Sequence, residues 1–284
     1  MTDPAHREEA LDRLSRARAF VFDIDGTLVL GDEKNCGFRP LPGATELLSH
    51  LAEAHIPYVA FTNGTLRTPK ATAEMLRDAG LLIADTAVLT PSAVAAGYLG
   101  RQKYKRILVL GCEGVWRPLA DAGLDVVLPG QLEGPVDAVY VGWYREFTMD
   151  DLEAACRCVL DGAKVFTSSN VPFFATAKGR AFGTSFAISA MIKALTGVEA
   201  RVLGKPSIEA LAFAASLLNV ERAEIAVVGD DPLLEVQMAL EGGALAVAVT
   251  TGLTDEAAFL GLGADSRPDL IFRGVGDILD HLGS

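Results

Sequence analysis

Two aspartates that follow a short apolar segment place the strongest constraint on how this chain can fold. Residues 19–22 (Ala-Phe-Val-Phe) are apolar and stop at residues 23–27 (Asp-Ile-Asp-Gly-Thr). Such a run, bounded by Asp and Gly, predicts a buried strand that ends in a turn. Because side chains alternate along an extended chain, Asp23 and Asp25 share one face and Ile24 points to the other. Neighbouring carboxylates repel each other, so the pattern favours a hard divalent cation between them.

Two other interpretations of this stretch are open. The aspartates could belong to a solvated turn, or to a calcium-binding loop. An EF-hand loop needs further oxygen ligands and a closing Glu within about 12 residues. This chain has Leu28, Val29 and Leu30 where such ligands should fall, which makes a calcium loop the weaker alternative.

Length and charge limit the class of protein. A chain of 284 residues has room for a large core and tends to form two lobes. No apolar run reaches the roughly 18 residues of a membrane span, and the polar segment 1–18 does not resemble a signal peptide, so we expect a cytoplasmic protein without membrane contact. The formal charge of −12 argues against nucleic acid as a partner and means that an anionic substrate must be attracted locally.

Cysteine and histidine provide little support for other chemistry. Cys36, Cys112, Cys156 and Cys158 fit free thiols in a reducing compartment, and the Cys-Arg-Cys spacing is neither a zinc knuckle nor a thioredoxin motif. The four histidines lie away from every motif below. The turn at residues 111–114 (Gly-Cys-Glu-Gly) lacks the G-x-G-x-x-G spacing of a dinucleotide site.

Strand and helix patterns alternate along the chain, which predicts an α/β fold with a parallel sheet and right-handed crossovers. The expected strands of a first lobe cover residues 19–22, 58–61, 87–90, 225–229, 245–249 and 270–272. Between them, residues 102–203 carry strands and helices of their own. We therefore expect one domain formed by residues 1–101 and 204–284, with residues 102–203 inserted as a second α/β domain.

Three of the expected strands end in polar residues. In open α/β sheets, ligands bind beyond the carboxyl ends of the strands. If these strands are neighbours, their polar ends converge although about 200 residues separate them along the chain. Taken singly, the turn at 62–64 and a lysine before a helix are unremarkable features. The candidate residues, in chain order, are Asp23, Asp25, Thr62, Asn63, Gly64, Lys205, Asp230, Asp231 and Glu235.

Taken together and in this order, these residues resemble the four motifs of the haloacid dehalogenase-like (HAD) phosphohydrolases. Residues 23–28 match DxDGT[LV], Thr62 and Asn63 match the second motif, Lys205 before a helix matches the third, and Gly229-Asp230 the fourth. The resemblance implies a Rossmann-like core. It also implies that Asp23 is the nucleophile that forms an aspartyl-phosphate.

The same resemblance assigns the remaining roles. Asp25 would act as general acid and base, a task that requires a raised pKa. Thr62, Asn63 and Gly64 would bind the phosphoryl oxygens, and Lys205 would neutralise the nucleophile and the transferred group.

Magnesium is the implied cofactor. Asp23, Asp230 and the backbone carbonyl of Asp25 would hold Mg²⁺. The charge count supports a cation independently, since five carboxylates would otherwise surround a phosphate dianion with only Lys205 against them. Glu235, in place of the usual Asp, would order a metal-bound water or Lys205, and Asp231 would be a nearby loop acid.

The position of the inserted residues 102–203 restricts the resemblance to one branch of the family. About 140 residues lie between Thr62 and Lys205, as in type-C2 caps, and stretches such as residues 140–148 and 195–207 resemble subclass IIA, the NagD and 4-nitrophenylphosphatase branch. The Asn and Asp of that branch's cap loop fall on Ser169 and Val171 here. This departure leaves the substrate open and favours a less polar leaving group.

The function we predict is a Mg²⁺-dependent phosphatase of small phosphorylated metabolites, such as sugar, nucleotide, glycerol or aryl phosphates. Two alternatives stay open: a phosphotransferase or mutase that uses the same aspartyl-phosphate, and a non-catalytic phosphate- or metal-binding module. Assembly into a homo-oligomer through the cap is also open.

Overall fold

The computed structural model describes residues 4–31, 37–176 and 179–282, and the chain divides into two compact units. The first unit contains the residues up to Thr62, Thr72–Leu89 and the chain from Ala210 onward, and the second contains Asn63–Ala71 and Thr90–Glu209. These limits differ from the expected boundaries after residues 101 and 203. The reason is local packing, since helix α4 (Pro91–Arg101) packs on helix α5 (Glu113–Asp121) of the second unit.

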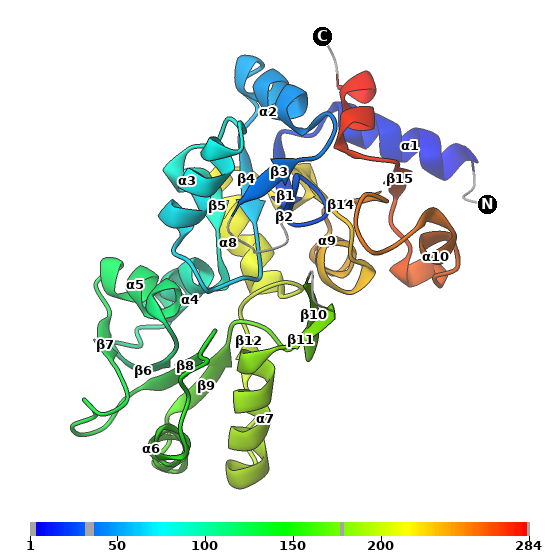
Figure 1. Ribbon diagram of the computed structural model, residues 1–284. Coiled ribbons are helices and arrows are strands. Elements are labelled where there is room, and N and C mark those ends of the chain that lie inside the picture. Colours follow the sequence, from blue (N-terminus) through cyan, green and yellow to red (C-terminus); the bar gives the residue numbers. More distant parts are fainter. Residues whose placement is uncertain (1–3, 32–36, 177–178, 283–284) are drawn as a thin grey trace. The chain divides into compact units, whose positions relative to one another are not determined.

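The first unit is built on a six-stranded parallel sheet with the order β15-β14-β13-β1-β4-β5. Figure 1 labels β1, β4, β5, β14 and β15 of this sheet. Its strands are β1 (Ala19–Asp23), β4 (Tyr58–Phe61), β5 (Val88–Leu89), β13 (Ile225–Gly229), β14 (Leu245–Val249) and β15 (Leu270–Phe272). Every residue of β1, β13 and β14 is buried. Such continuous burial is typical of parallel strands that are covered on both faces.

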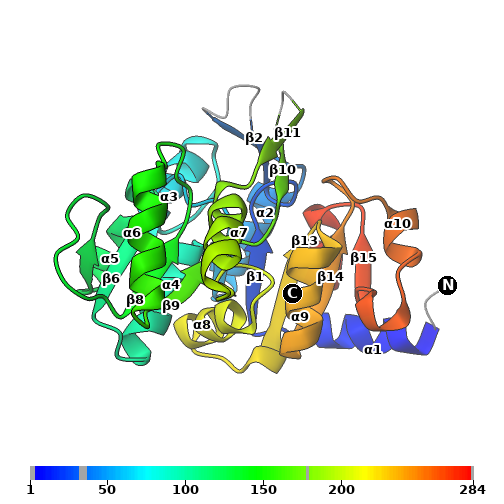
Figure 2. The same cartoon turned by 90° about the horizontal axis from the view of Figure 1, so that it is seen from below.

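Helices and short turns complete the first unit. They are α1 (Pro4–Ser15), α2 (Ala44–Glu53), α3 (Pro69–Asp78), η1 (Asp85–Ala87), α8 (Ile208–Leu218), η2 (Arg222–Glu224), η3 (Pro232–Val236), α9 (Gln237–Gly242), α10 (Glu256–Leu260), η4 (Ala264–Ser266) and η5 (Val275–His281). In α2 the apolar face formed by Leu47, Leu48 and Leu51 is completely buried. Helix α9 packs beside β14 (Figure 2).

The second unit has its own five-stranded parallel sheet, with the order β12-β9-β8-β6-β7. Its elements are β6 (Arg106–Leu110), β7 (Asp125–Val127), β8 (Ala138–Val141), β9 (Lys164–Thr167), β12 (Arg201–Val202), α4, α5, α6 (Met149–Leu160) and α7 (Thr184–Thr196). A separate apolar core lies between this sheet and its helices. The predicted fold class, a parallel Rossmann-like core with an inserted α/β unit, is confirmed.

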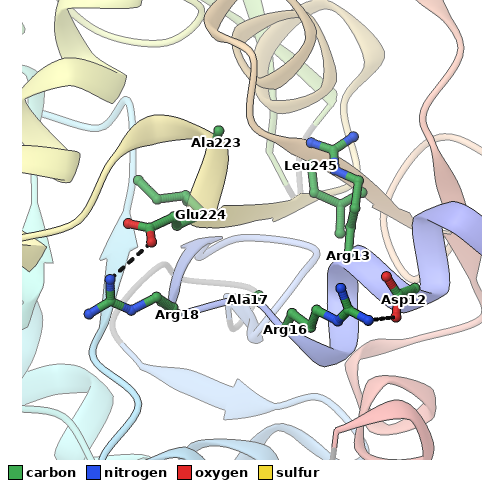
Figure 3. Close-up of a pocket in the computed structure, with 9 residues that line it drawn as sticks. Asp12, Arg13, Arg16, Ala17, Arg18, Ala223, Glu224 and Leu245 are labelled. Atoms are coloured by element: carbon green, nitrogen blue, oxygen red, sulfur yellow. Dashed lines mark hydrogen bonds and ion pairs between the residues drawn. The ribbon is translucent and has the colours of Figure 1, made fainter.

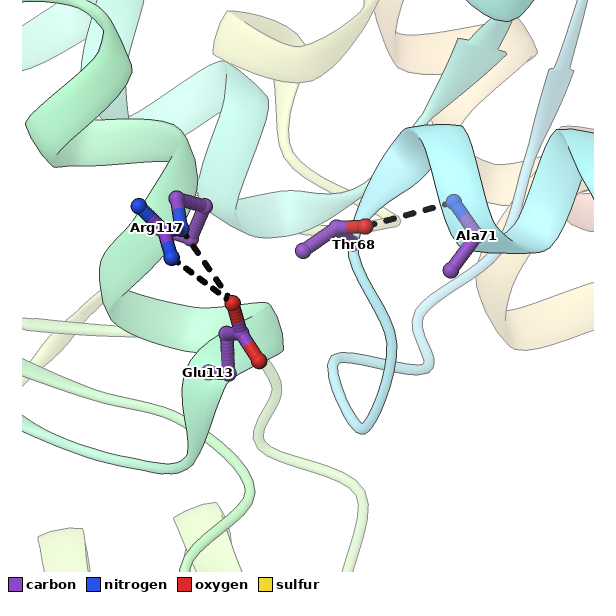
Figure 4. A network of polar contacts seen from close by, with 4 residues as sticks. All are labelled: Thr68, Ala71, Glu113 and Arg117. Atoms are coloured by element: carbon purple, nitrogen blue, oxygen red, sulfur yellow. Dashed lines mark hydrogen bonds and ion pairs between the residues drawn. The ribbon is translucent and has the colours of Figure 1, made fainter.

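Helix caps follow the sequence signals. The Thr68 hydroxyl accepts a hydrogen bond from the Ala71 N–H at 3.2 Å (Figure 4), as expected for a Thr before Pro69 at the start of α3. Thr148 and Asp151 form a capping box at the start of α6. Along α5, Glu113 and Arg117 form an i,i+4 ion pair at 3.0 Å.

Two hairpins were not expected. Strands β2 (Val29–Gly31) and β3 (Phe38–Pro40) pair antiparallel, and so do β10 (Phe173–Thr176) and β11 (Gly179–Phe182). Strands of only three or four residues carry no clear alternation, and three of these four also contain Pro or Gly. Cys36 lies outside the described residues, while Cys112, Cys156 and Cys158 are free thiols. None of the helices in the described ranges is long and apolar enough to cross a membrane.

Gly43 precedes α2 and gives a test of close backbone packing. Its φ is 83°, and a Cβ there would lie 2.3 Å from the Gly276 Cα. Gly80 has a φ of 95° but open space around it. We expect Gly80→Ala to lower the free energy of unfolding by about 1–2 kcal/mol through backbone strain alone. Gly43→Ala must cost more, because the backbone also has to move. Urea unfolding measures the free energy of unfolding of both variants. Equal losses of stability would contradict the close packing of Gly43 against Gly276.

Candidate active site

Three neighbouring parallel strands bring the predicted acidic and hydroxyl residues to one edge of the first sheet. Strand β1 lies between β13 and β4, with Phe22 level with Val228 and Asp23 level with Phe61. Asp23 therefore ends the central strand, Asp230 follows β13 directly, and Thr62 follows β4 directly. The three strands are therefore neighbours, as a shared site for these three residues requires.

The turn after β1 gives its two aspartates different environments. Asp23 is only 8% exposed, whereas Asp25 is exposed. Ile24 is completely buried and belongs to the apolar core, as side-chain alternation predicts. The turn is closed by a hydrogen bond from the Gly26 N–H to the Val29 carbonyl at 2.8 Å. A buried carboxylate suits a nucleophile, and an exposed one suits proton exchange with substrate or water.

The donor set at the sheet edge fits a hard cation. Asp23 and Asp230 are both buried carboxylates at the ends of adjacent strands. In the described ranges no group of three or more His, Cys, Asp or Glu side chains is arranged to hold a metal. The expected magnesium shell needs two carboxylates, the Asp25 carbonyl and water, so it does not require a third acidic side chain.

Asp231 and Glu235 have structural partners in the turn η3. The Asp231 carboxylate accepts a hydrogen bond from the Leu233 N–H at 2.7 Å and so caps this turn. Glu235 is 2% exposed and accepts from the Asp231 N–H at 3.2 Å. A Cβ on Gly229 would lie 2.2 Å from the Glu235 Cγ. The longer Glu is therefore packed tightly against the end of β13.

Asn63 and Lys205 form a pair within the second unit. The Asn63 amide donates to the Lys205 carbonyl at 3.0 Å and accepts from the Lys205 N–H at 2.8 Å. A Cβ on Gly204 would lie 2.6 Å from the same Asn63 oxygen. Lys205 is 1% exposed. Two candidate residues that are far apart in sequence are thus joined directly, while Gly64, the third candidate of this unit, is exposed.

A loop that the sequence analysis missed also belongs to this edge of the first sheet. After β14, the Thr251 hydroxyl donates to the Gly26 carbonyl at 2.6 Å, and the Leu253 N–H donates to the Asp230 carboxylate at 3.2 Å. The available signal was a fourth parallel strand, 245–249, followed by Thr-Thr-Gly. Such a Thr-Gly turn is common after strands, so by itself it indicates no function.

A hollow in the first unit lies at the opposite edge of the sheet (Figure 3). It is bordered by the amino ends of β13 and β14 and by the segment before β1. Its arginines have acidic partners: Arg18 pairs with Glu224 and Arg16 with Asp12, both at 2.9 Å. The hollow is therefore separate from the candidate active site, and its charges are largely balanced.

Comparisons with known proteins agree with this arrangement. A family model described as haloacid dehalogenase-like hydrolase matches residues 20–125, and a second, described as HAD-hydrolase-like, matches residues 202–278. The acid sugar phosphatase of Staphylococcus epidermidis is 28% identical over 239 residues, which cover 84% of this chain and 88% of that protein.

Solved structures share the fold over nearly the whole chain. The p-nitrophenyl phosphatase from Archaeoglobus fulgidus has a TM-score of 0.82 at 26% identity, with 94% of this chain and 99% of that chain covered. The glycerol phosphate phosphatase from Mycobacterium tuberculosis, solved in complex with magnesium, has a TM-score of 0.81 at 24% identity, with 94% and 77% covered.

With matched motifs at the ends of adjacent strands, the chain belongs to the haloacid dehalogenase-like hydrolases. Within that family it falls into subclass IIA, the branch of NagD and the 4-nitrophenylphosphatases, as its sequence predicted. The predicted enzyme class, a HAD-like phosphoric monoester hydrolase, is confirmed with it.

The Asn63–Lys205 pair can be tested without reference to activity. Replacing Asn63 by Ala removes two hydrogen bonds worth about 0.5–1.5 kcal/mol each. We expect hydrogen exchange at the Lys205 amide to become at least about tenfold faster. Asn170→Ala, at an exposed position of the same unit, should leave that amide unchanged. Equal protection in all three proteins would show that Asn63 does not hold Lys205.

Proposed function

We propose that this enzyme is a Mg²⁺-dependent phosphatase that hydrolyses small phosphate monoesters through an aspartyl-phosphate. The observation that carries the proposal is the placement of Asp23, Thr62 and Asp230 at the ends of three adjacent parallel strands. The phosphatase relatives, one of them solved with magnesium, support both the reaction class and the cofactor.

The first step forms a bond between an Asp23 oxygen and phosphorus while the ester P–O bond breaks. Asp25 gives its proton to the leaving oxygen, and its exposed position supports this role. In the second step water attacks the phosphorus and passes a proton to Asp25. Inorganic phosphate leaves, and the Asp23 carboxylate is restored.

Bound Mg²⁺ would offset the negative charge of the carboxylates and of the phosphoryl group. Asp23, Asp230 and the Asp25 backbone carbonyl are the groups proposed to hold it. Glu235, buried behind Gly229, is proposed to support them. Asp231 is proposed to help indirectly, by capping the turn that carries Glu235.

Phosphate recognition is proposed for Thr62, Gly64 and the remaining N–H of the Asn63 amide. Lys205, which Asn63 holds by its backbone, would neutralise the nucleophile and the transferred group. We propose that residues 102–203, which make up most of the second unit, act as a C2 cap that selects a small phosphorylated metabolite.

Replacing the nucleophile tests the reaction. We expect Asp23→Asn to lower phosphate release by at least about a thousandfold, because the amide cannot form the acyl-phosphate. Release is measured over sugar, nucleotide, glycerol and aryl phosphates, with Mg²⁺ or with EDTA, and EDTA should abolish the activity of the parent. Asp12→Asn makes the same change at an exposed residue paired with Arg16 and should have no effect.

Several outcomes would contradict the proposal. Equal hydrolysis by Asp23→Asn and the parent would remove Asp23 as the nucleophile. Product recovered on an added alcohol in preference to water would indicate a phosphotransferase. No turnover, together with a melting temperature that Mg²⁺ does not change, would leave a non-catalytic module.

The cap loop at residues 168–172 is held firmly and carries the departure from the subclass pattern. The Ser185 hydroxyl donates to the Ser169 carbonyl at 3.2 Å, and the Ser169 hydroxyl accepts from the Val171 N–H at 3.2 Å. Val171 is half-buried. The loop therefore presents an apolar side chain at a position where the subclass has Asp, which supports an apolar leaving group.

Restoring that acid should change the choice of substrate. We expect Val171→Asp to lower kcat/KM for an aryl phosphate about tenfold relative to a sugar phosphate, because an apolar contact of 1–3 kcal/mol is lost. Val198→Asp, at an exposed position of the same unit, should leave the ratio unchanged. A ratio unaffected by Val171→Asp would exclude this loop from leaving-group selection.

A further inference from the structure

The loop after β14, residues 250–253, lies next to two of the proposed catalytic motifs although none of its residues matched a motif. Strand β14 pairs with β13, and the register sets Ala248 level with Gly229. The loop therefore leaves the sheet beside Asp230. Its contacts reach both Asp230 and the turn that carries Asp23 and Asp25.

Asp230 is enclosed by backbone on this side. A Cβ on Gly252 would lie 1.7 Å from the Asp230 Oδ2, so any larger residue there would displace the carboxylate. A Cβ on Gly26, whose φ is 87°, would lie 2.8 Å from the same oxygen. The Leu253 N–H donates to that oxygen at 3.2 Å. The Leu253 amide and the two close glycines thus restrict the position of the Asp230 carboxylate.

Thr251 connects this loop to the first motif. Its hydroxyl donates to the Gly26 carbonyl at 2.6 Å, across 225 positions of sequence. The hydroxyl of the adjacent Thr250 donates instead to the Arg273 carbonyl at 3.4 Å, on the other side of the loop. The Thr251 hydroxyl therefore joins the loop after β14, which contacts Asp230, to the turn that contains Asp25.

We propose that Thr251, Gly252 and Leu253 form a positioning loop that orients the Asp230 carboxylate for a divalent cation and sets the affinity of the enzyme for Mg²⁺. The inference rests on the proposed function, since it concerns the same cation. Its physical basis is preorganisation: a carboxylate that is already fixed loses less rotational freedom when a cation binds. Groups that orient metal ligands commonly change metal affinity by about 10- to 100-fold when they are removed.

The test measures Mg²⁺ binding by calorimetry without substrate. Thr251→Val keeps the shape of the side chain but removes the hydroxyl, and we expect it to raise the Kd for Mg²⁺ at least about tenfold. Thr251→Ser restores the donor and should recover binding close to that of the parent. Thr250→Val makes the same change at the adjacent residue and should leave the Kd unchanged.

A second pair of variants tests the amide that contacts Asp230. Leu253→Pro removes the N–H donor, whereas Leu253→Ala keeps it, and the Leu253 side chain is 84% exposed. We expect weaker Mg²⁺ binding for the proline variant alone. This pair serves the same purpose if Thr251→Val does not fold, which its melting temperature without metal reveals.

Different results would overturn the positioning role of the loop and the proposed function. If the parent releases phosphate with Mg²⁺ but both Thr251→Val and Leu253→Pro bind Mg²⁺ as tightly as the parent, the positioning role is overturned and the proposed function stands. A parent that neither binds Mg²⁺ nor turns over phosphate overturns the proposed function, and the role of the loop with it.

Discussion

The molecule depends on electrostatic crowding at one edge of a parallel sheet. Strands β13 and β1 are adjacent, and each delivers a buried carboxylate to the same edge. Burial strengthens the repulsion between such groups, so a fold that keeps both must offset their charge. Backbone amides do part of this, as the Leu253 N–H does for Asp230. Under the proposed function, a bound cation and Lys205 offset the rest of the negative charge.

Much of the fold was predictable because its signals are local. The apolar run of β13 and the Thr148–Asp151 capping box each specify their element within a few residues. The antiparallel pairs β2–β3 and β10–β11 were not predictable in the same way, because each strand is only three or four residues long and depends on pairing with its neighbour. The compact units also do not coincide with the predicted division, because α4 packs on α5 and no local sequence pattern indicates that contact.

The residues of the candidate site were also predictable only where their signals are local. Asp23, Thr62 and Asp230 could be expected together because each lies at the carboxyl end of a strand and the strands alternate with helices. The partners of Asn63 and Thr251 could not be expected, because each donates or accepts across a long stretch of sequence. A motif specifies which residue carries the chemistry, while the groups that hold it are fixed only by tertiary structure.

The link between Asn63 and Lys205 has a consequence for how such enzymes diversify. The two residues are 142 positions apart. Hydrogen bonds between the Asn63 side-chain amide and the Lys205 backbone hold the two ends of the intervening segment together. Whatever lies between those anchors can lengthen, shorten or be exchanged while the lysine keeps its attachment. Under the proposed function, the Asn63 amide would allow the proposed cap to vary while Lys205 keeps its place.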